Sequence, residues 1–252
     1  MKLKNISEYY DERLNKCLRD GDNAYIKKYT TVGFKRAYKM WEEYSHDSIE
    51  SFFDDFIKEY DSEFLVKNCE RCYEEMRENG SEIGKDELFD ILIRRLVIET
   101  FIGFKFEEII KDEFVRMGVP IHNYDILSEE DERELDGKYG VDIIIFNGDE
   151  IAHFIQVKNI TFASNSNYMR KKRKEFFNKE REANEYVDDN KSRHLLFYIY
   201  DKYEFIKGNG YRFYVNPRTN KLNFRLDELV NDDGSMKVRL RDLKTYTFPN
   251  YI

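Results

Sequence analysis

Three polar side chains interrupt two apolar stretches within residues 140–162, GVDIIIFNGDEIAHFIQVKNITF. Asp142 opens the first stretch, and Gln156 and Lys158 lie within the second. Carboxylate and amide oxygens are ligands suited to Mg²⁺, which keeps several waters and also binds phosphate oxygens. A lysine beside the metal can orient or help to deprotonate a water. These side chains therefore suit metal-assisted hydrolysis of a phosphodiester, with a further acidic group expected from a neighbouring element.

The residue types predict that the two stretches form a β-hairpin. Residues 141–146 are β-branched and aromatic, residues 147–150 (NGDE) are typical of a turn, and residues 151–159 follow as a second strand. Gln156 and Lys158 are two positions apart, so they project from one face of their strand.

The length of the turn decides whether Asp142 joins that face. A three-residue loop at positions 148–150 pairs Asn147 with Ile151 and sets Asp142 opposite Gln156. A two- or four-residue loop would turn Asp142 to the opposite face, because side chains alternate along a strand. We expect the three-residue loop.

The elements around the hairpin predict an α/β domain with a mixed sheet. Residues 85–118 carry apolar side chains on more than one helical face, so this helix is expected to be largely buried or broken near Gly103. Helical spacing returns at 167–187, and 195–200 is a continuous apolar run typical of a buried strand. Helices are also expected over residues 1–80, and further strands at 211–215 and 244–248.

The hairpin resembles the core of the PD-(D/E)XK nuclease superfamily. That superfamily has an acid at the start of one strand and acid-x-Lys on the next, matched here by Asp142 and by the run from Gln156 to Lys158. Upstream, Gly103 is followed four residues later by Glu107, which is similar to the first core helix, whose glutamate often faces the metal. The resemblance covers roughly residues 95–215, and residues 97–110 and 136–143 also resemble small type II restriction enzymes of the MjaI kind.

Two positions depart from the superfamily's pattern. Val141 precedes Asp142 in place of a proline that is dispensable, whereas Gln156 takes the second acidic position. Some restriction endonucleases carry Gln there, but a neutral ligand weakens metal affinity and leaves more of the charge to the acids. For the helix acid, Glu108 and Glu99 are alternatives to Glu107, since Glu99 lies eight residues earlier on a similar helix face.

The resemblance implies a restriction-endonuclease-like core and a Mg²⁺-dependent, sequence-specific endonuclease acting on double-stranded DNA. Such an enzyme is a type II restriction enzyme that leaves 5′-phosphate and 3′-hydroxyl ends. Asp142, Gln156 and Glu107 would hold the metal, and Lys158 would act on the attacking water. Cutting both strands favours a homodimer with two sites related by a two-fold axis.

A run of five cations follows the hairpin and is a candidate for binding DNA phosphates: Arg170, Lys171, Lys172, Arg173 and Lys174. Asn165 and Asn167, in the loop before it, could contact base edges or phosphates. The alternative for the run is a solvated helix face whose cations pair with Glu175, Glu180 and Glu182.

Other readings of the same residues stay open. Asp142 and Lys158 could be an ion pair at a sheet edge, and Gln156 could simply face solvent. A nuclease core could also serve repair, junction resolution or RNA cleavage. In a different class of function, the domain would bind nucleic acid or a protein partner without cutting, and Gln156 would mark a decayed site.

Length and composition indicate a globular protein. The chain has 252 residues, is 41% hydrophobic and carries a net charge of −8, which argues against a surface coated in basic residues but not against a local basic groove. It has no long apolar run, no apolar segment of a signal peptide and three cysteines, expected to be reduced thiols. We therefore expect a cytoplasmic protein without membrane contact. Its expected regions are a helical one at 1–84 for dimerisation or DNA reading, the core at 85–215 and an extension at 216–252.

Overall fold

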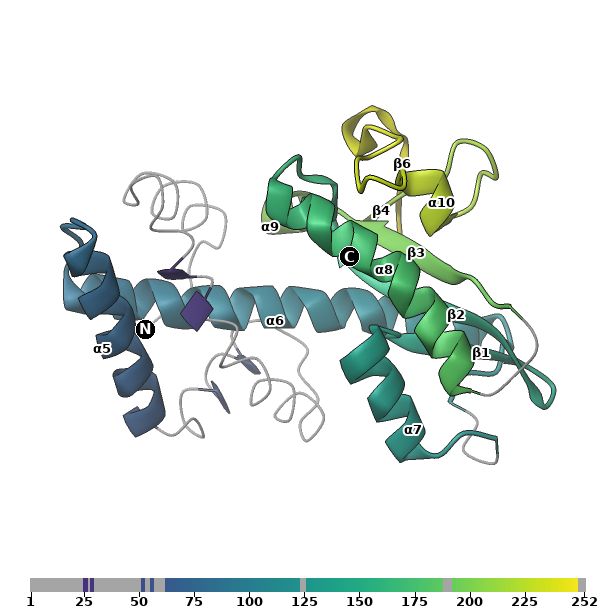
Figure 1. Cartoon of the computed structure of the whole chain (residues 1–252), viewed down its shortest axis with the longest axis horizontal. Coiled ribbons are helices and arrows are strands. Elements are labelled where there is room, and N and C mark those ends of the chain that lie inside the picture. Colours follow the sequence, from purple (N-terminus) through teal and green to yellow (C-terminus); the bar gives the residue numbers. More distant parts are fainter. Residues whose placement is uncertain are drawn as a thin grey trace. The chain divides into compact units, whose positions relative to one another are not determined.

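The computed structural model describes residues 25, 26, 28, 29, 51, 52, 55, 56, 62–122, 126–187 and 192–248, with backbone only at 62–65. The chain divides into two compact units, Met1–Phe104 and Lys105–Ile252, and Figure 1 shows both. This division falls inside a helix, whereas the boundary expected at residue 84 falls in the turn before that helix. The assignment of functional regions to 1–84, 85–215 and 216–252 stays a prediction.

The first unit is helical wherever it is described. Helix α5 spans Ser62–Glu78, and helix α6 spans Lys85–Arg116 without a break at Gly103, so its first twenty residues belong to this unit. The short link between the two helices lies at the expected glycine-containing turn, where Gly80 has a φ of +82°. Before residue 62, the expected helices concern positions that are mostly outside the described residues, although the eight described there are helical.

The second unit is built on a six-stranded mixed sheet, as the α/β prediction required. Its strands are β1 (Ile143–Asn147), β2 (Glu150–Asn159), β3 (Leu195–Tyr200), β4 (Arg212–Tyr214), β5 (Asn223–Arg225) and β6 (Thr245–Thr247). The order is β1-β2-β3-β4-β6, and β5 also pairs with β3. Strands β2 and β3 are parallel and the other pairs antiparallel. The segment 216–252 therefore completes the sheet through β5 and β6.

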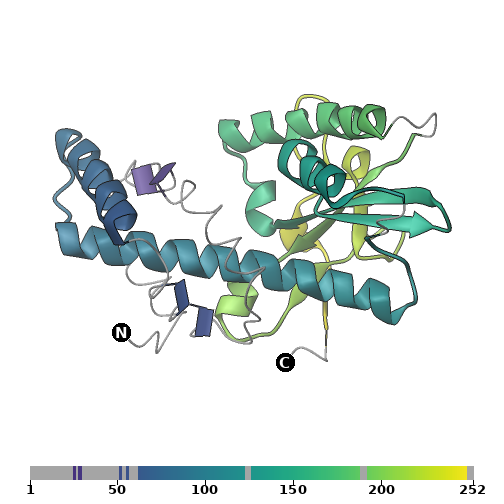
Figure 2. The same ribbon diagram turned by 90° about the horizontal axis from the view of Figure 1, so that it is seen from below.

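Helix α8 (Asn167–Tyr186) makes the crossover between the parallel strands β2 and β3. Phe176 of α8 packs edge-on against Phe197 of β3, with ring centroids 5.3 Å apart. On the other face, Phe106 of α6 stacks on Tyr200 of β3 at 4.0 Å. Within this unit, α8 and the last turns of α6 thus cover opposite faces of the sheet, as Figure 2 shows.

Short helices connect these elements: α7 (Glu129–Glu134), the π-helix η2 (Leu135–Tyr139), the 3-10 helix η3 (Ile160–Ala163), α9 (Lys202–Ile206), α10 (Leu226–Leu229) and the 3-10 helix η4 (Leu240–Asp242). Helix α7 begins at the capping box of Ser128 and Asp131. Among the described residues, no helix is both long and apolar enough to cross a membrane.

Candidate active site

The β1–β2 hairpin brings Asp142 and Gln156 together, although by a different turn from the one expected. Asn147 pairs with Glu150, so the loop has two residues rather than three. The register then shifts between Ile145 and Phe146, where Ala152 is the extra residue of a β-bulge. Beyond the bulge Ile143 pairs with Ile155, and one further step sets Asp142 opposite Gln156. The shorter loop and the bulge compensate, so the expected register is correct while the expected turn is wrong.

Hydrogen bonds hold the Asp142 carboxylate against β2. The backbone N–H of Asp142 donates to the Ile155 carbonyl at 2.8 Å. The Asp142 Oδ2 atom accepts hydrogen bonds from the Val157 N–H, at 2.6 Å, and from the Gln156 side-chain amide. The Oδ1 atom accepts no hydrogen bond from the described residues, so one carboxylate oxygen is left for another partner.

The Gln156 side chain is one of the few buried polar groups of the described chain, with 1% of its surface exposed. Its Nε2 atom donates to Asp142, whereas its Oε1 atom is buried and accepts no hydrogen bond from the described residues. An unsatisfied buried oxygen is unfavourable in a folded protein and points to a missing donor or cation. The reading of Gln156 as a solvent-facing strand residue is therefore wrong.

Among the candidate helix acids, Glu107 interacts electrostatically with the Asp142 carboxylate. Burial and then the Asp142 carboxylate raise the pKa of Glu107 well above its ordinary value, and Lys111 and Lys158 only partly oppose this. Glu108 instead forms an ion pair with Lys105, at 2.9 Å. Glu99 belongs to the first compact unit.

Lys158 projects from the same face of β2 as Gln156, because side chains two positions apart in a strand lie on one face. Gln156 pairs with Phe197 and Lys158 with Ile199 of the parallel strand β3. The Lys158 Nζ atom lies 5.9 Å from the centre of the Phe176 ring on α8. It forms no ion pair or hydrogen bond with any residue that the structure describes. The reading of Lys158 as the ion-pair partner of Asp142 is therefore not supported by a contact within the described chain.

Lys179 of α8 is a member of this site that the sequence analysis missed. Its Nζ atom lies 5.3 Å from the centre of the same Phe176 ring. Burial, then Lys158, lower the pKa of Lys179. The sequence gives only a weak indication that Lys179 belongs to the site. Lys179 shares a helix face with Phe176 and Ala183, and only their burial in the structure shows that this face is turned inward.

Gly140 closes the site from the side of η2. It ends this helix in a left-handed conformation, with φ +70° and ψ +44°. A Cβ atom at this position would lie 2.7 Å from Gln156 Oε1, 3.3 Å from Phe176 Cε1 and 3.4 Å from Lys179 Nζ. The amide and the second lysine therefore converge on the space that a side chain at position 140 would fill.

The oxygen-only donor set fits Mg²⁺ better than a softer metal, with water or substrate completing the coordination. The unsatisfied Gln156 Oε1 and the raised pKa of Glu107 both indicate a site that a cation would stabilise. Two features count against tight binding. The described residues contain no group of three or more His, Cys, Asp or Glu side chains arranged for a metal, and Nε2 rather than Oε1 of Gln156 faces Asp142.

The basic run on α8 divides into residues with different surroundings. Arg173 is fully buried and donates to the carbonyls of Gly234 at 2.7 Å, Ser164 at 3.0 Å and Phe162. It ties the C-terminal segment to the loop before α8, so we remove it from the candidate phosphate contacts.

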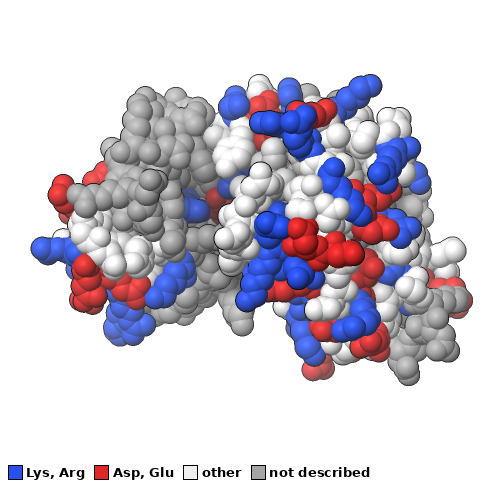
Figure 3. All heavy atoms as spheres, turned by 45° about the horizontal axis from the view of Figure 1, so that its top comes forward, with Lys and Arg blue, Asp and Glu red and all other residues white. Residues whose placement is uncertain are grey.

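The remaining cations of the run lie at the surface. Arg170 pairs with Asp233 at 2.5 Å and Lys172 with Glu175 at 2.9 Å, while Lys171 and Lys174 are exposed. Figure 3 shows basic and acidic side chains interspersed on the face that it presents.

The loop before α8 is exposed at both asparagines singled out from the sequence, Asn165 and Asn167. Ser166 between them caps the helix by accepting from the Met169 N–H at 3.2 Å. Asn165 also lines a pocket of about 610 Å³, whose wall is formed by η3, Tyr203 and residues 236, 238 and 239–241. None of Glu107, Asp142, Gln156 and Lys158 lines it.

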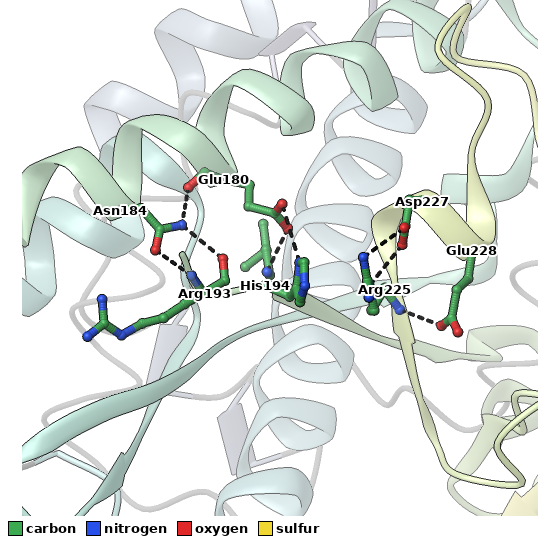
Figure 4. A network of polar contacts seen from close by, with 8 residues as sticks. Glu180, Asn184, Arg193, His194, Arg225, Asp227 and Glu228 are labelled. Atoms are coloured by element: carbon green, nitrogen blue, oxygen red, sulfur yellow. Dashed lines mark hydrogen bonds and ion pairs between the residues drawn. The ribbon is translucent and has the colours of Figure 1, made fainter. Parts of the chain in front are cut away.

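The far end of α8 is anchored to the start of β3 by the network in Figure 4. Asn184 exchanges two hydrogen bonds with the backbone of Arg193, at 2.7 and 2.9 Å. Glu180 accepts from the Leu195 N–H at 2.7 Å. Because Glu180 directly follows Lys179, this anchor holds the second lysine over the sheet.

Comparison of the chain with protein-family models, with curated proteins and with solved structures found no match.

Proposed function

We propose that the chain is a Mg²⁺-dependent, sequence-specific endonuclease of double-stranded DNA, similar to type II restriction enzymes of the PD-(D/E)XK superfamily. One observation carries the proposal: Asp142, Gln156 and Lys158 share one face of the hairpin. The raised pKa of Glu107, of which the Asp142 carboxylate is one cause, supports it. The restriction-endonuclease-like core would consist of α6 from Lys105 onward, β1, β2, α8 and β3.

In this proposal the site residues divide into metal ligands and a lysine that orients the attacking water. Asp142, Glu107 and Gln156 would hold Mg²⁺, which would supply Lewis-acid activation of the phosphodiester and of water. Lys158 orients the attacking water, and its lack of an ion pair among the described residues leaves the ammonium available for this role. Water adds to phosphorus, the bond to the 3′-oxygen breaks, and the products are a 5′-phosphate and a 3′-hydroxyl that has gained a proton.

DNA contact is assigned to the exposed part of the loop and of α8. Lys171 and Lys174 are exposed and form no ion pair with the residues that the structure describes. Arg170 and Lys172 could exchange their carboxylate partners for phosphates at small cost, since exposed ion pairs contribute about 0–1 kcal/mol. Asn165 and Asn167 are the candidates for base contacts. A homodimer would cut both strands, and light scattering of the full chain with and without duplex DNA tests this assembly.

The test of activity is incubation of the purified protein with mixed plasmid and genomic DNA, with Mg²⁺ or with EDTA, followed by sequencing of the ends. Asp142→Asn and Lys158→Met are expected to lower cleavage by about 10²–10⁴-fold, the range typical of acid–base groups. Asp149→Asn in the exposed hairpin turn and Lys221→Met, at an exposed lysine outside the basic run, are matched controls for the catalytic step. Absence of Mg²⁺-dependent cleavage, or its survival in both site variants, would show that the proposal is wrong.

A second candidate function is binding without cleavage, and the Gln156 amide favours it. The neutral Gln156 stands at the second acidic position, and its Nε2 atom already donates a hydrogen bond to the Asp142 carboxylate. Gln156→Glu separates the two functions: a decayed site should gain Mg²⁺-dependent cleavage from it, whereas an active Gln variant should already cut. Palindromic duplexes compared with flaps and junctions separate restriction from a structure-selective nuclease.

A further inference from the structure

Two lysines of the candidate site lie against one aromatic ring, and neither is ion-paired to a residue that the structure describes. Lys158 on β2 and Lys179 on α8 place their Nζ atoms 5.9 and 5.3 Å from the Phe176 ring centre. Within the described part of the chain, neither ammonium group forms a hydrogen bond or an ion pair. Two cations of the α8 basic run differ in this respect, since Arg170 and Lys172 both have carboxylate partners.

The arrangement is electrostatically incomplete. Both lysines are partly buried. Burial and then Lys158 lower the pKa of Lys179, because like charges repel more strongly where water is partly excluded. Glu175 and Asp142 oppose this effect at Lys179 but rank below burial and the two neighbouring lysines. A bound anion would supply the missing charge.

Gly140 and the two anchored ends of α8 determine the position of Lys179. The space beside Gly140, which has no side chain, admits both Lys179 Nζ and Gln156 Oε1. Ser166 caps the start of α8, and Glu180 and Asn184 anchor its end to β3. Lys179 is thus held beside Asp142 and Gln156 while its flexible stem leaves the ammonium able to follow a ligand.

We propose that Lys158 and Lys179 together bind one phosphate group, and that Lys179 is a substrate-binding residue holding a non-bridging oxygen of the phosphodiester. A tetrahedral phosphate presents several oxygens in different directions, so ammonium groups from a strand and a helix can each take one. That the phosphate belongs to DNA rests on the proposed function, whereas the binding of a phosphate group does not.

The first experiment measures anion binding without metal or catalysis. Inorganic phosphate and thymidine 3′,5′-bisphosphate are titrated into the metal-free protein in EDTA, followed by NMR of the lysine side chains and by calorimetry. Lys158→Met and Lys179→Met are each expected to weaken binding at least tenfold, and Lys179→Arg to retain most of it. Lys207→Met, at an exposed lysine that is ion-paired to Glu204 and lies outside the basic run, is the matched control and should bind within twofold of the wild type. No binding to the wild type, or equal binding by Lys179→Met, would overturn the inference.

The second experiment separates this inference from the proposed function. If the protein cuts DNA, Lys179→Met should raise KM for DNA or lower kcat, and Lys179→Arg should restore activity in part. Unchanged kcat and KM would refute the role in substrate binding. If no cleavage is seen with any DNA, the nuclease proposal fails while the phosphate titration still decides the anion site. A merely structural lysine would lose stability on substitution, whereas Lys179→Met should unfold at the same or a higher urea concentration, because it removes an unpaired cation.

Discussion

Substitution of Gly140 by alanine tests the geometry on which the site depends. Gly140 and Gly118 both end a helix with nearly the same left-handed backbone, at φ +70° and +69°. Their N–H groups make similar capping bonds, at 3.0 Å to Asp136 and 2.9 Å to Val115. Their surroundings differ, because a Cβ at position 118 meets nothing within 4 Å. Gly118→Ala is therefore the matched control for the backbone effect alone.

The expected loss of stability has two parts. A left-handed conformation costs a residue with a Cβ about 1–2 kcal/mol, which applies to both variants. In Gly140→Ala the new Cβ would also lie 2.7 Å from Gln156 Oε1, so the buried amide must move. Moving it breaks the hydrogen bond to the Asp142 carboxylate, and hydrogen bonds to charged groups contribute about 1.5–3 kcal/mol. Gly140→Ala should therefore lose about 2.5–5 kcal/mol, and Gly118→Ala about 1–2 kcal/mol.

Urea unfolding followed by circular dichroism measures both variants, and a double-mutant cycle isolates the clash. In a Gln156→Ala background the amide is absent, so Gly140→Ala should cost only about 1–2 kcal/mol, as at position 118. The reasoning is refuted if the two glycine variants lose equal stability, or if the cost of Gly140→Ala is the same with and without the Gln156 side chain.

Three further predictions concern stability and reactivity. Glu107→Gln should raise the free energy of unfolding at pH 8 by about 0.5–2 kcal/mol, since burial and Asp142 raise the pKa of Glu107. The wild type loses stability as the pH rises from the ordinary glutamate range through that raised pKa. Urea titrations at several pH values should therefore show that the gain in stability of Glu107→Gln vanishes at lower pH. Arg173→Met should lose about 1–3 kcal/mol for each buried carbonyl left without a donor, whereas Arg170→Met should lose about 0–1 kcal/mol in the same assay. Burial raises the pKa of the Cys69 thiol to about 11, so peptide mapping after iodoacetamide at pH 8 should find it unlabelled in the native protein and labelled in urea.

Several elements of the second unit follow from local sequence patterns. The helical period over 85–118 and 167–187, and the apolar runs of the hairpin and of 195–200, each predict an element that the structure contains. These patterns suffice because the helical and strand periods, the caps and the turns are properties of neighbouring residues. Strand β5 was not predicted, since Asn223–Arg225 lies in a largely polar segment without an apolar run and pairs with β3 in the fold.

Tertiary packing determines which residues contact the polar side chains of the hairpin and of the basic run. The pattern of the sequence placed Gln156 and Lys158 on one face, but the β-bulge at Ala152, which no local signal marked, is what brings Asp142 opposite the amide across a two-residue loop. Likewise, five adjacent cations look alike in sequence, yet Arg173 alone among them is buried by the C-terminal segment.

The sequence by itself determined the α/β elements and the chemical types gathered on one hairpin face. Only the tertiary structure decided that Glu107 lies within the field of Asp142, that Lys179 shares the ring of Phe176 with Lys158, and that Gly140 leaves room for both the lysine and the amide. The physical reason is that the period of a strand or helix sets which side chains share a face. The residues that pack against that face come from distant parts of the chain, and burial and charge act between them only after folding.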